Sequence, residues 1–170
     1  MPTMSTAVPI VRSRAEGERR WFAGGGLHTW KATAEETGGA FLLFEDEMTQ
    51  GKRTPLHTHP EADESMYVLD GEILMHIDGQ QHPVRAGGLA VAPRGVPHAF
   101  LVVSPTARLL CLQTPGCCQA FYLAASDPVG ADTTGPGQGD QPGEVDFGRV
   151  RAAAQQHGGI VLLGPPPFDD

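Results

Sequence analysis

The sequence is poor in cysteine, aromatic residues and positive charge. Its three cysteines, two of them adjacent, make neither a paired disulfide framework nor a Cys-x-x-Cys zinc motif. Lysine and arginine number 12 against 20 acidic residues, so the formal net charge is −8. Nonspecific nucleic-acid binding requires a basic surface, and we therefore expect no nucleic-acid partner.

Long hydrophobic runs are also missing. No stretch approaches the roughly 20 apolar residues of a membrane-spanning helix. Residues 1–22 contain no apolar run of the length found in secretory signals. These absences predict a soluble, cytoplasmic protein with no membrane partner.

Glycine and proline are abundant, at 22 and 15 of 170 residues. Short apolar runs alternate with turn residues between Phe22 and Pro115, a pattern typical of an all-β sandwich or barrel. Asp78-Gly79, between "ILMHI" and "QQHPV", predicts a tight hairpin. The expected fold is therefore all-β, a single barrel-like unit with appendages at both ends.

Composition divides the chain into four expected parts. The stretch "SDPVGADTTGPGQGDQPG" offers almost nothing to bury and predicts a loop or linker. After it, "DFGRVRAAAQQHGG" predicts a short helix that Asp146 caps and Gly158 ends. The parts are a flexible N-terminal segment (1–20), the barrel (21–125), the Gly/Pro-rich loop (126–145), and a helix with an extended tail (146–170).

Two histidines stand one residue apart in "PLHTHPEADESMYVLDGE". Residues i and i+2 of an extended chain point to the same face, so His57 and His59 can converge. Glu64 heads an otherwise apolar strand face, where a carboxylate is costly to bury unless it is paired or bound to a metal. His98 begins the strand "HAFLVV" and provides a third imidazole. This donor set suits a divalent transition metal such as Ni, Fe, Mn, Co, Cu or Zn.

These residues carry a resemblance to a known family. Gly51-x5-His57-x-His59-x4-Glu64-x6-Gly71 resembles the first motif of the cupins at every defined position. Gly87-x5-Pro93-x-Gly95-x2-His98 resembles the second, although the asparagine that usually ends that motif is replaced by Val102. The resemblance implies a double-stranded β-helix, or small jelly roll, with the metal inside one mouth.

The wider chain is similar to the small single-domain quercetin 2,3-dioxygenase-like cupins of bacteria. That resemblance implies a metal-dependent dioxygenase acting on a flavonol or another enol-bearing aromatic, with O2 as co-substrate. Glu64 would be a metal ligand, the general base that takes the substrate hydroxyl proton, or both. Strand parity makes Met66 and Phe100 the expected substrate-contacting residues.

Two other classes of function remain open. One is a cupin isomerase, cyclase or decarboxylase that uses the metal only as a Lewis acid. The other is a non-catalytic cupin that binds a small molecule. In each case we expect a homodimer, because the N-terminal segment offers a cover for an open sheet edge on a neighbouring copy.

Overall fold

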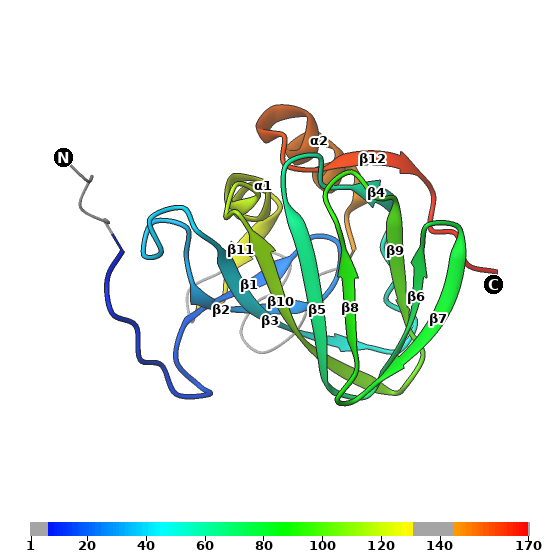
Figure 1. Cartoon of the computed structure of the whole chain (residues 1–170), viewed down its shortest axis with the longest axis horizontal. Coiled ribbons are helices and arrows are strands. Elements are labelled where there is room, and N and C mark those ends of the chain that lie inside the picture. The colour runs from blue at the N-terminus through cyan, green and yellow to red at the C-terminus, as the bar shows by residue number, and fades with distance from the viewer. Residues whose placement is uncertain (1–6, 131–144, 170) are drawn as a thin grey trace.

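The computed structural model describes residues 7–130 and 145–169. The chain forms two antiparallel sheets that face each other (Figure 1). The first has the order β11 (Ser126–Pro128), β1 (Glu18–Phe22), β2 (Leu27–Ala32), β3 (Leu42–Thr49), β10 (Thr106–Thr114), β5 (Asp63–Asp70), β8 (Leu89–Ala92). The second has the order β12 (Val161–Gly164), β4 (Leu56–Thr58), β9 (His98–Val102), β6 (Glu72–Ile77), β7 (Gln80–Arg85). This is the expected jelly-roll architecture.

The core lies between the sheets because their strands alternate buried and more exposed residues. In β10, Ala107, Leu109 and Cys111 are buried, while the residues between them are partly exposed. Side chains of a strand point alternately to the two faces of its sheet, so this pattern directs one face inward. Leu109 and Ile73, one from each sheet, are fully buried there.

The hairpin between β6 and β7 turns at the predicted dipeptide. Asp78 has a φ of 50° and Gly79 a φ of 77°. Two-residue hairpin loops of this type need a positive φ at both positions, which asparagine, aspartate and glycine tolerate best. The prediction made from Asp78-Gly79 is therefore confirmed.

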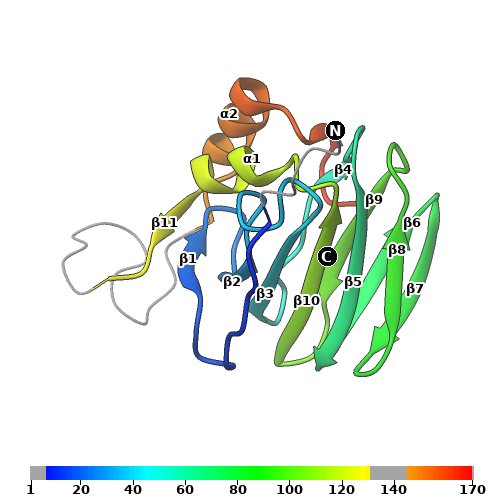
Figure 2. The same cartoon turned by 60° about the vertical axis from the view of Figure 1, so that its left-hand side comes forward.

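Two helices lie over one end of the barrel, beside β4 and β12 (Figures 1 and 2). Helix α1 (Gln119–Ala124) packs against helix α2 (Phe147–His157). As predicted, α2 starts after Asp146, whose side chain accepts a hydrogen bond from Arg149 N, and ends at Gly158. No helix in the described parts of the chain is long and apolar enough to cross a membrane.

The structure departs from the sequence expectation at two boundaries. The expected loop 126–145 begins with a strand, because Ser126–Pro128 pairs with β1; residues 131–144 lie outside the described residues. The expected flexible segment 1–20 already contains the start of β1. Its preceding turn is held by Lys31 Nζ, which donates to the carbonyl oxygens of Ser13, Arg14 and Glu16.

Candidate metal centre

The four predicted ligand residues meet between the two sheets. Glu64 comes from β5 of the first sheet, and His57 comes from β4 of the second. His57 and His98 are directly opposite each other where β4 pairs with β9. His59 follows β4 immediately. We call His57, His59, Glu64 and His98 the metal cluster.

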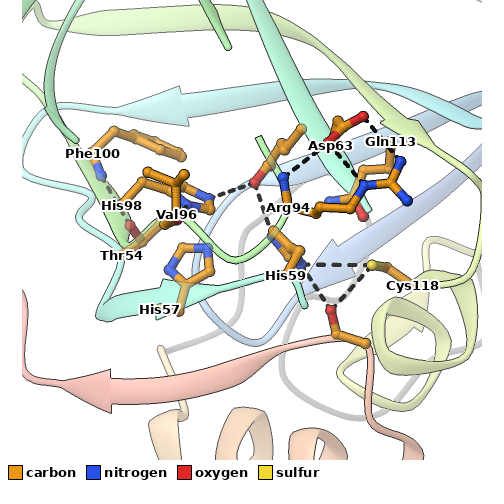
Figure 3. A network of polar contacts seen from close by, with 12 residues as sticks. Thr54, His57, His59, Asp63, Arg94, Val96, His98, Phe100, Gln113 and Cys118 are labelled. Carbon is orange, nitrogen blue, oxygen red and sulfur yellow. Dashed lines mark hydrogen bonds and ion pairs between the residues drawn. The ribbon is translucent and has the colours of Figure 1, made fainter. Parts of the chain in front are cut away.

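The potential ligand atoms of the metal cluster lie within 4.8 Å of one another, and all four residues are buried. Glu64 Oε2 is 2.8 Å from Nε2 of His59 and 2.8 Å from Nε2 of His98. The rings of His57 and His98 lie 4.3 Å apart between centroids. Figure 3 shows the three imidazoles converging on one region.

Backbone carbonyl groups fix the ring orientation of all three histidines. The Nδ1 atoms of His57, His59 and His98 lie 2.7, 2.9 and 2.9 Å from the carbonyl oxygens of residues 55, 159 and 96. A carbonyl oxygen only accepts, so each Nδ1 carries the donated proton. Nε2 is then the nitrogen left for a metal, and in His59 and His98 it faces Glu64. Outer-shell bonds of this kind hold metal-ligating histidines in place.

This donor set fits a divalent cation. Three Nε2 atoms and one carboxylate are concentrated in a buried space, where lone pairs repel unless a proton or a cation lies between them. Nε2 of His59 lies within ion-pair distance of Glu64 but makes no well-directed hydrogen bond. Imidazole and carboxylate ligands together suit a first-row transition metal.

The surroundings of the metal cluster favour a neutral His57 ring and an ionised Glu64 carboxylate, the protonation states in which these groups bind metals. Burial, together with the neighbouring His98 and His59 rings, lowers the pKa of His57 to about 3, so this ring is neutral at pH 7. Burial opposes ionisation of Glu64, but the attraction of His59 and the hydrogen bond from His98 outweigh it and hold the Glu64 pKa well below 4.5. For His59, burial favours the neutral ring, but the Glu64 carboxylate and Cys118 raise its pKa well above 6.5. A metal would replace the proton that His59 otherwise holds against Glu64.

The loops that carry the two motifs are tied to each other. Asp63 accepts hydrogen bonds from Arg94 at the backbone N, Nε and Nη2, at 2.9, 3.2 and 3.1 Å. Gly95 N donates to the carbonyl oxygen of His59 at 2.9 Å. Val102, which replaces the usual asparagine, uses its backbone instead: Gly51 N donates to its oxygen and its N donates to Lys52 O.

The support behind His59 comes from two residues outside both motifs, Gly159 in the C-terminal part of the chain and Cys118 near the end of the barrel segment. Gly159, just after α2, provides the carbonyl for His59 Nδ1 from 100 residues away. Cys118 Sγ lies 3.2 Å from the same carbonyl oxygen and 3.6 Å from His59 Nδ1 (Figure 3). No motif position pointed to either residue, because the contact is made only through the tertiary fold.

A mostly apolar pocket opens beside the metal cluster. His57, Glu64 and His98 form part of its wall. Phe100, predicted to contact substrate, is a lining residue, whereas Met66 is buried in the core at 1% exposure and is not one. The other lining residues are Phe22, Gly24, His28, Phe44, Asp46, Lys52, Thr54, Pro55, Cys111, Phe121, Tyr122, Phe147, Val150 and Ile160.

Comparison with known proteins agrees with this geometry. A family model described as a cupin domain matches residues 44–112, which include the whole metal cluster. The quercetin 2,3-dioxygenase of Bacillus subtilis is 30% identical over 122 residues, or 72% of this chain. The alignment covers 36% of that enzyme, so the chain spans about a third of the relative's length.

Solved structures show the same fold. A predicted oxalate decarboxylase from Thermotoga maritima is 23% identical, with a TM-score of 0.56 over 63% of this chain and 99% of that one. An RmlC-like cupin from Shewanella frigidimarina is 17% identical, with a TM-score of 0.57 over 65% of this chain and 94% of that one. At these identities the likeness establishes architecture alone.

Proposed function

The chain belongs to the cupin superfamily, and from that premise we propose that it is a metal-dependent dioxygenase of a flavonol or another enol-bearing aromatic. The observation that carries the proposal is the metal cluster: its three imidazoles keep Nδ1 on backbone carbonyls, and their potential ligand atoms lie within 4.8 Å of one another and of the Glu64 carboxylate. The likeness to the Bacillus quercetin 2,3-dioxygenase supports the oxidative reading.

His57, His59, Glu64 and His98 would hold a divalent transition metal. When bound, the metal supplies Lewis acidity and redox capacity next to the pocket. A catalytic site of this kind keeps at least one coordination position open for a ligand from outside the protein.

The protein's own residues then have distinct tasks. Glu64 is buried and anionic at neutral pH, so its carboxylate can take the proton of the substrate hydroxyl. Phe22, Phe44 and Phe100 line the pocket, exclude water and provide flat apolar walls for an aromatic ring. Exclusion of water strengthens the electrostatic interaction between Glu64 and the hydroxyl proton.

Oxygen consumption in the presence of a flavonol tests the proposal. We expect the reconstituted protein to take up O2 and place both of its atoms in the products. Glu64→Gln should retain measurable metal but lose about two orders of magnitude or more in turnover, because the amide cannot accept the proton as a base. Glu61→Gln is a matched control, since Glu61 is exposed three residues away.

Two results would contradict the proposal. Glu64→Gln turning over at the wild-type rate would remove the base role. Turnover that continues unchanged without O2 would replace the dioxygenase with a Lewis-acid isomerase, cyclase or decarboxylase. Tight ligand binding with no product would instead favour a non-catalytic binding protein.

We also propose a homodimer that forms through the edge strand β8. Leu89 and Val91 on β8, and Tyr67 on the adjacent β5, are 60%, 45% and 42% exposed. β8 ends the first sheet, so its outer backbone groups are available to pair with a second copy. Light scattering should give about twice the 18.0 kDa of one chain, and Val91→Lys should reduce that mass to one chain. A monomeric wild type would contradict this.

The cytoplasm is the proposed compartment. Cys111, Cys117 and Cys118 are all free thiols, which persist in a reducing environment. Recovery of the native protein in the cytoplasmic fraction would support this, and recovery in a secreted fraction would contradict it.

A further inference from the structure

A single cationic side chain lies at the wall of the pocket. Lys52 is the only lysine or arginine among the described residues that line it. Its Nζ lies 4.6 Å from the ring centroid of Phe100 and 5.8 Å from that of Phe22. No hydrogen bond or ion pair from Nζ to another described residue is present. Cation–π contacts replace only part of the hydration that an ammonium group loses on burial.

The fold makes room for this lysine. Gly25 has a φ of 93°, and a Cβ at that position would lie 3.2 Å from Lys52 Cγ. Lys52 O also accepts from Val102 N at 2.8 Å, which fixes the backbone beneath the side chain. The ammonium group is therefore presented to the pocket by a braced turn. Burial lowers the Lys52 pKa, and the attraction of Asp46 and Glu64 opposes that effect.

Two further polar side chains line the same pocket, and each has an atom without a hydrogen-bond partner. His28 on β2 and Asp46 on β3 are directly opposite each other, with Nε2 3.6 Å from Oδ2. Both residues are buried, at 1% and 4% exposure. His28 Nδ1 and Asp46 Oδ1 have no hydrogen-bond partner. Buried polar atoms are rarely left unpaired in folded proteins, so this pair adds unsatisfied polarity beside the pocket.

The formal charges of the metal-loaded pocket favour a ligand with one negative charge. Lys52 contributes one positive charge, and Asp46 and Glu64 contribute one negative charge each. With a divalent metal in place of the His59 proton, the metal, Lys52, Asp46 and Glu64 would together carry a formal charge of +1. A monoanion would neutralise it, and buried charges without compensation are strongly unfavourable.

We propose that Lys52 is an anion-binding residue that selects a small planar carboxylate carrying an enol or phenol hydroxyl. The carboxylate lies against the Lys52 ammonium, and the hydroxyl lies toward the metal cluster. The proposal rests on the proposed function for the assignment of this pocket as the substrate site.

The size of the cavity agrees with a small ligand. About 50 Å³ is open to the centres of water molecules. One water needs at least roughly 10–15 Å³ by that measure, so the space holds only a few. A compact acid therefore fits the pocket in this conformation better than a flavonol of three rings.

Acids and their neutral amides provide a test that needs neither O2 nor turnover. The probes are formate, acetate and benzoate, each paired with formamide, acetamide or benzamide. Calorimetric Kd values would be measured for wild type and Lys52→Met, in both zinc-loaded and metal-free protein. We expect wild type to prefer at least one acid over its amide, and Lys52→Met to lose about tenfold or more of that preference in the same loading state.

Two further variants make the result specific. Lys52→Arg keeps the positive charge and should retain the preference, whereas thermal melting confirms that Lys52→Met is folded. Arg85→Met removes the same charge from an exposed side chain outside the pocket and should leave the preference unchanged. The proposal is overturned if no acid is preferred by wild type, or if Lys52→Met and Arg85→Met behave alike.

The outcomes separate this inference from the proposed dioxygenase. Lys52-dependent binding of acids without O2 uptake on any enol-bearing substrate would reject the dioxygenase and leave the anion site standing. O2 uptake on a neutral flavonol at equal rates in wild type and Lys52→Met would support the dioxygenase and reject the role of Lys52 in substrate selection.

Discussion

Substitution of Gly159 separates backbone strain from metal affinity. Gly159 has a φ of 79°, and a Cβ there would lie 3.1 Å from Cys118 Cα. Gly158 also has a positive φ, 67°, but a Cβ there meets nothing within 4 Å. Gly158, at a φ of 67° and a ψ of −152°, lies in a backbone region almost confined to glycine. A side chain at such positive-φ positions costs about 1–3 kcal/mol, so both Gly158→Ala and Gly159→Ala should lose stability of that order. Only Gly159→Ala also displaces the backbone that holds His59.

The metal affinity should therefore differ between the two variants. Gly159 O accepts from His59 Nδ1 at 2.9 Å. Loss of such an outer-shell partner typically weakens metal binding about 10–100-fold. We expect Gly159→Ala to show that loss and Gly158→Ala to bind zinc within about threefold of wild type.

Zinc affinity would be measured by competition with a chelating dye, and the free energy of unfolding by urea titration of the metal-free proteins. Equal zinc affinity in the two variants would refute the assignment of Gly159 O as the support of His59. A weaker affinity in Gly158→Ala would show that strain after α2, not the carbonyl contact, controls the site.

Three more predictions test separate contacts. Cys118→Ala should weaken zinc binding less than Gly159→Ala, because its removal of the sulfur leaves the hydrogen bond between His59 and the Gly159 carbonyl in place. A larger loss of zinc affinity than in Gly159→Ala, measured by the same competition, would contradict this. Arg94→Met should remove the side-chain hydrogen bonds between the two motif loops at Asp63 and so speed zinc release in a chelator-chase experiment. An unchanged release rate would reject the idea that this contact slows metal loss. Hydrogen bonding to Arg12 lowers the Glu36 pKa to about 2, so Glu36→Gln should lower stability at pH 7, and the difference from wild type should disappear as the pH falls from about 4.5 toward 2; a pH-independent difference in urea titrations would contradict it.

Local patterns predicted much of the barrel. The alternation of β10, the Asp78-Gly79 turn and the caps of α2 all depend on residues close in sequence. The hydrophobic pattern of β5 likewise placed Glu64 on a buried face. Such features follow from strand periodicity and turn chemistry, which act within a few residues.

Other features depend on distant contacts and could not be predicted in this way. The pattern of "QAFYLAA" fits a short strand and a helical turn equally well, and the segment forms α1 at Gln119–Ala124. β11 forms inside a stretch with the composition of a linker, because β1 provides a partner. Propensity is a weak guide for short segments that tertiary pairing can override.

The site shows the same division. The motif spacing drew attention to His57, His59, Glu64 and His98, whose ligand atoms the fold brings within 4.8 Å. Lys52 occupies an undefined position of the first motif, so no spacing rule singled it out. Met66 shares a face with Glu64, but strand parity gives a face and not a depth, and Met66 lies in the core.

Metal content tests the central claim most directly. Elemental analysis of the untagged protein, beside the His57→Ala/His98→Ala double variant, should find about one divalent transition metal per wild-type chain and almost none in the variant. The double variant loses two of the four donors of the metal cluster, which leaves too few to compete with water and buffer. A wild type that holds no metal even after reconstitution, or a double variant that retains it, would contradict the account.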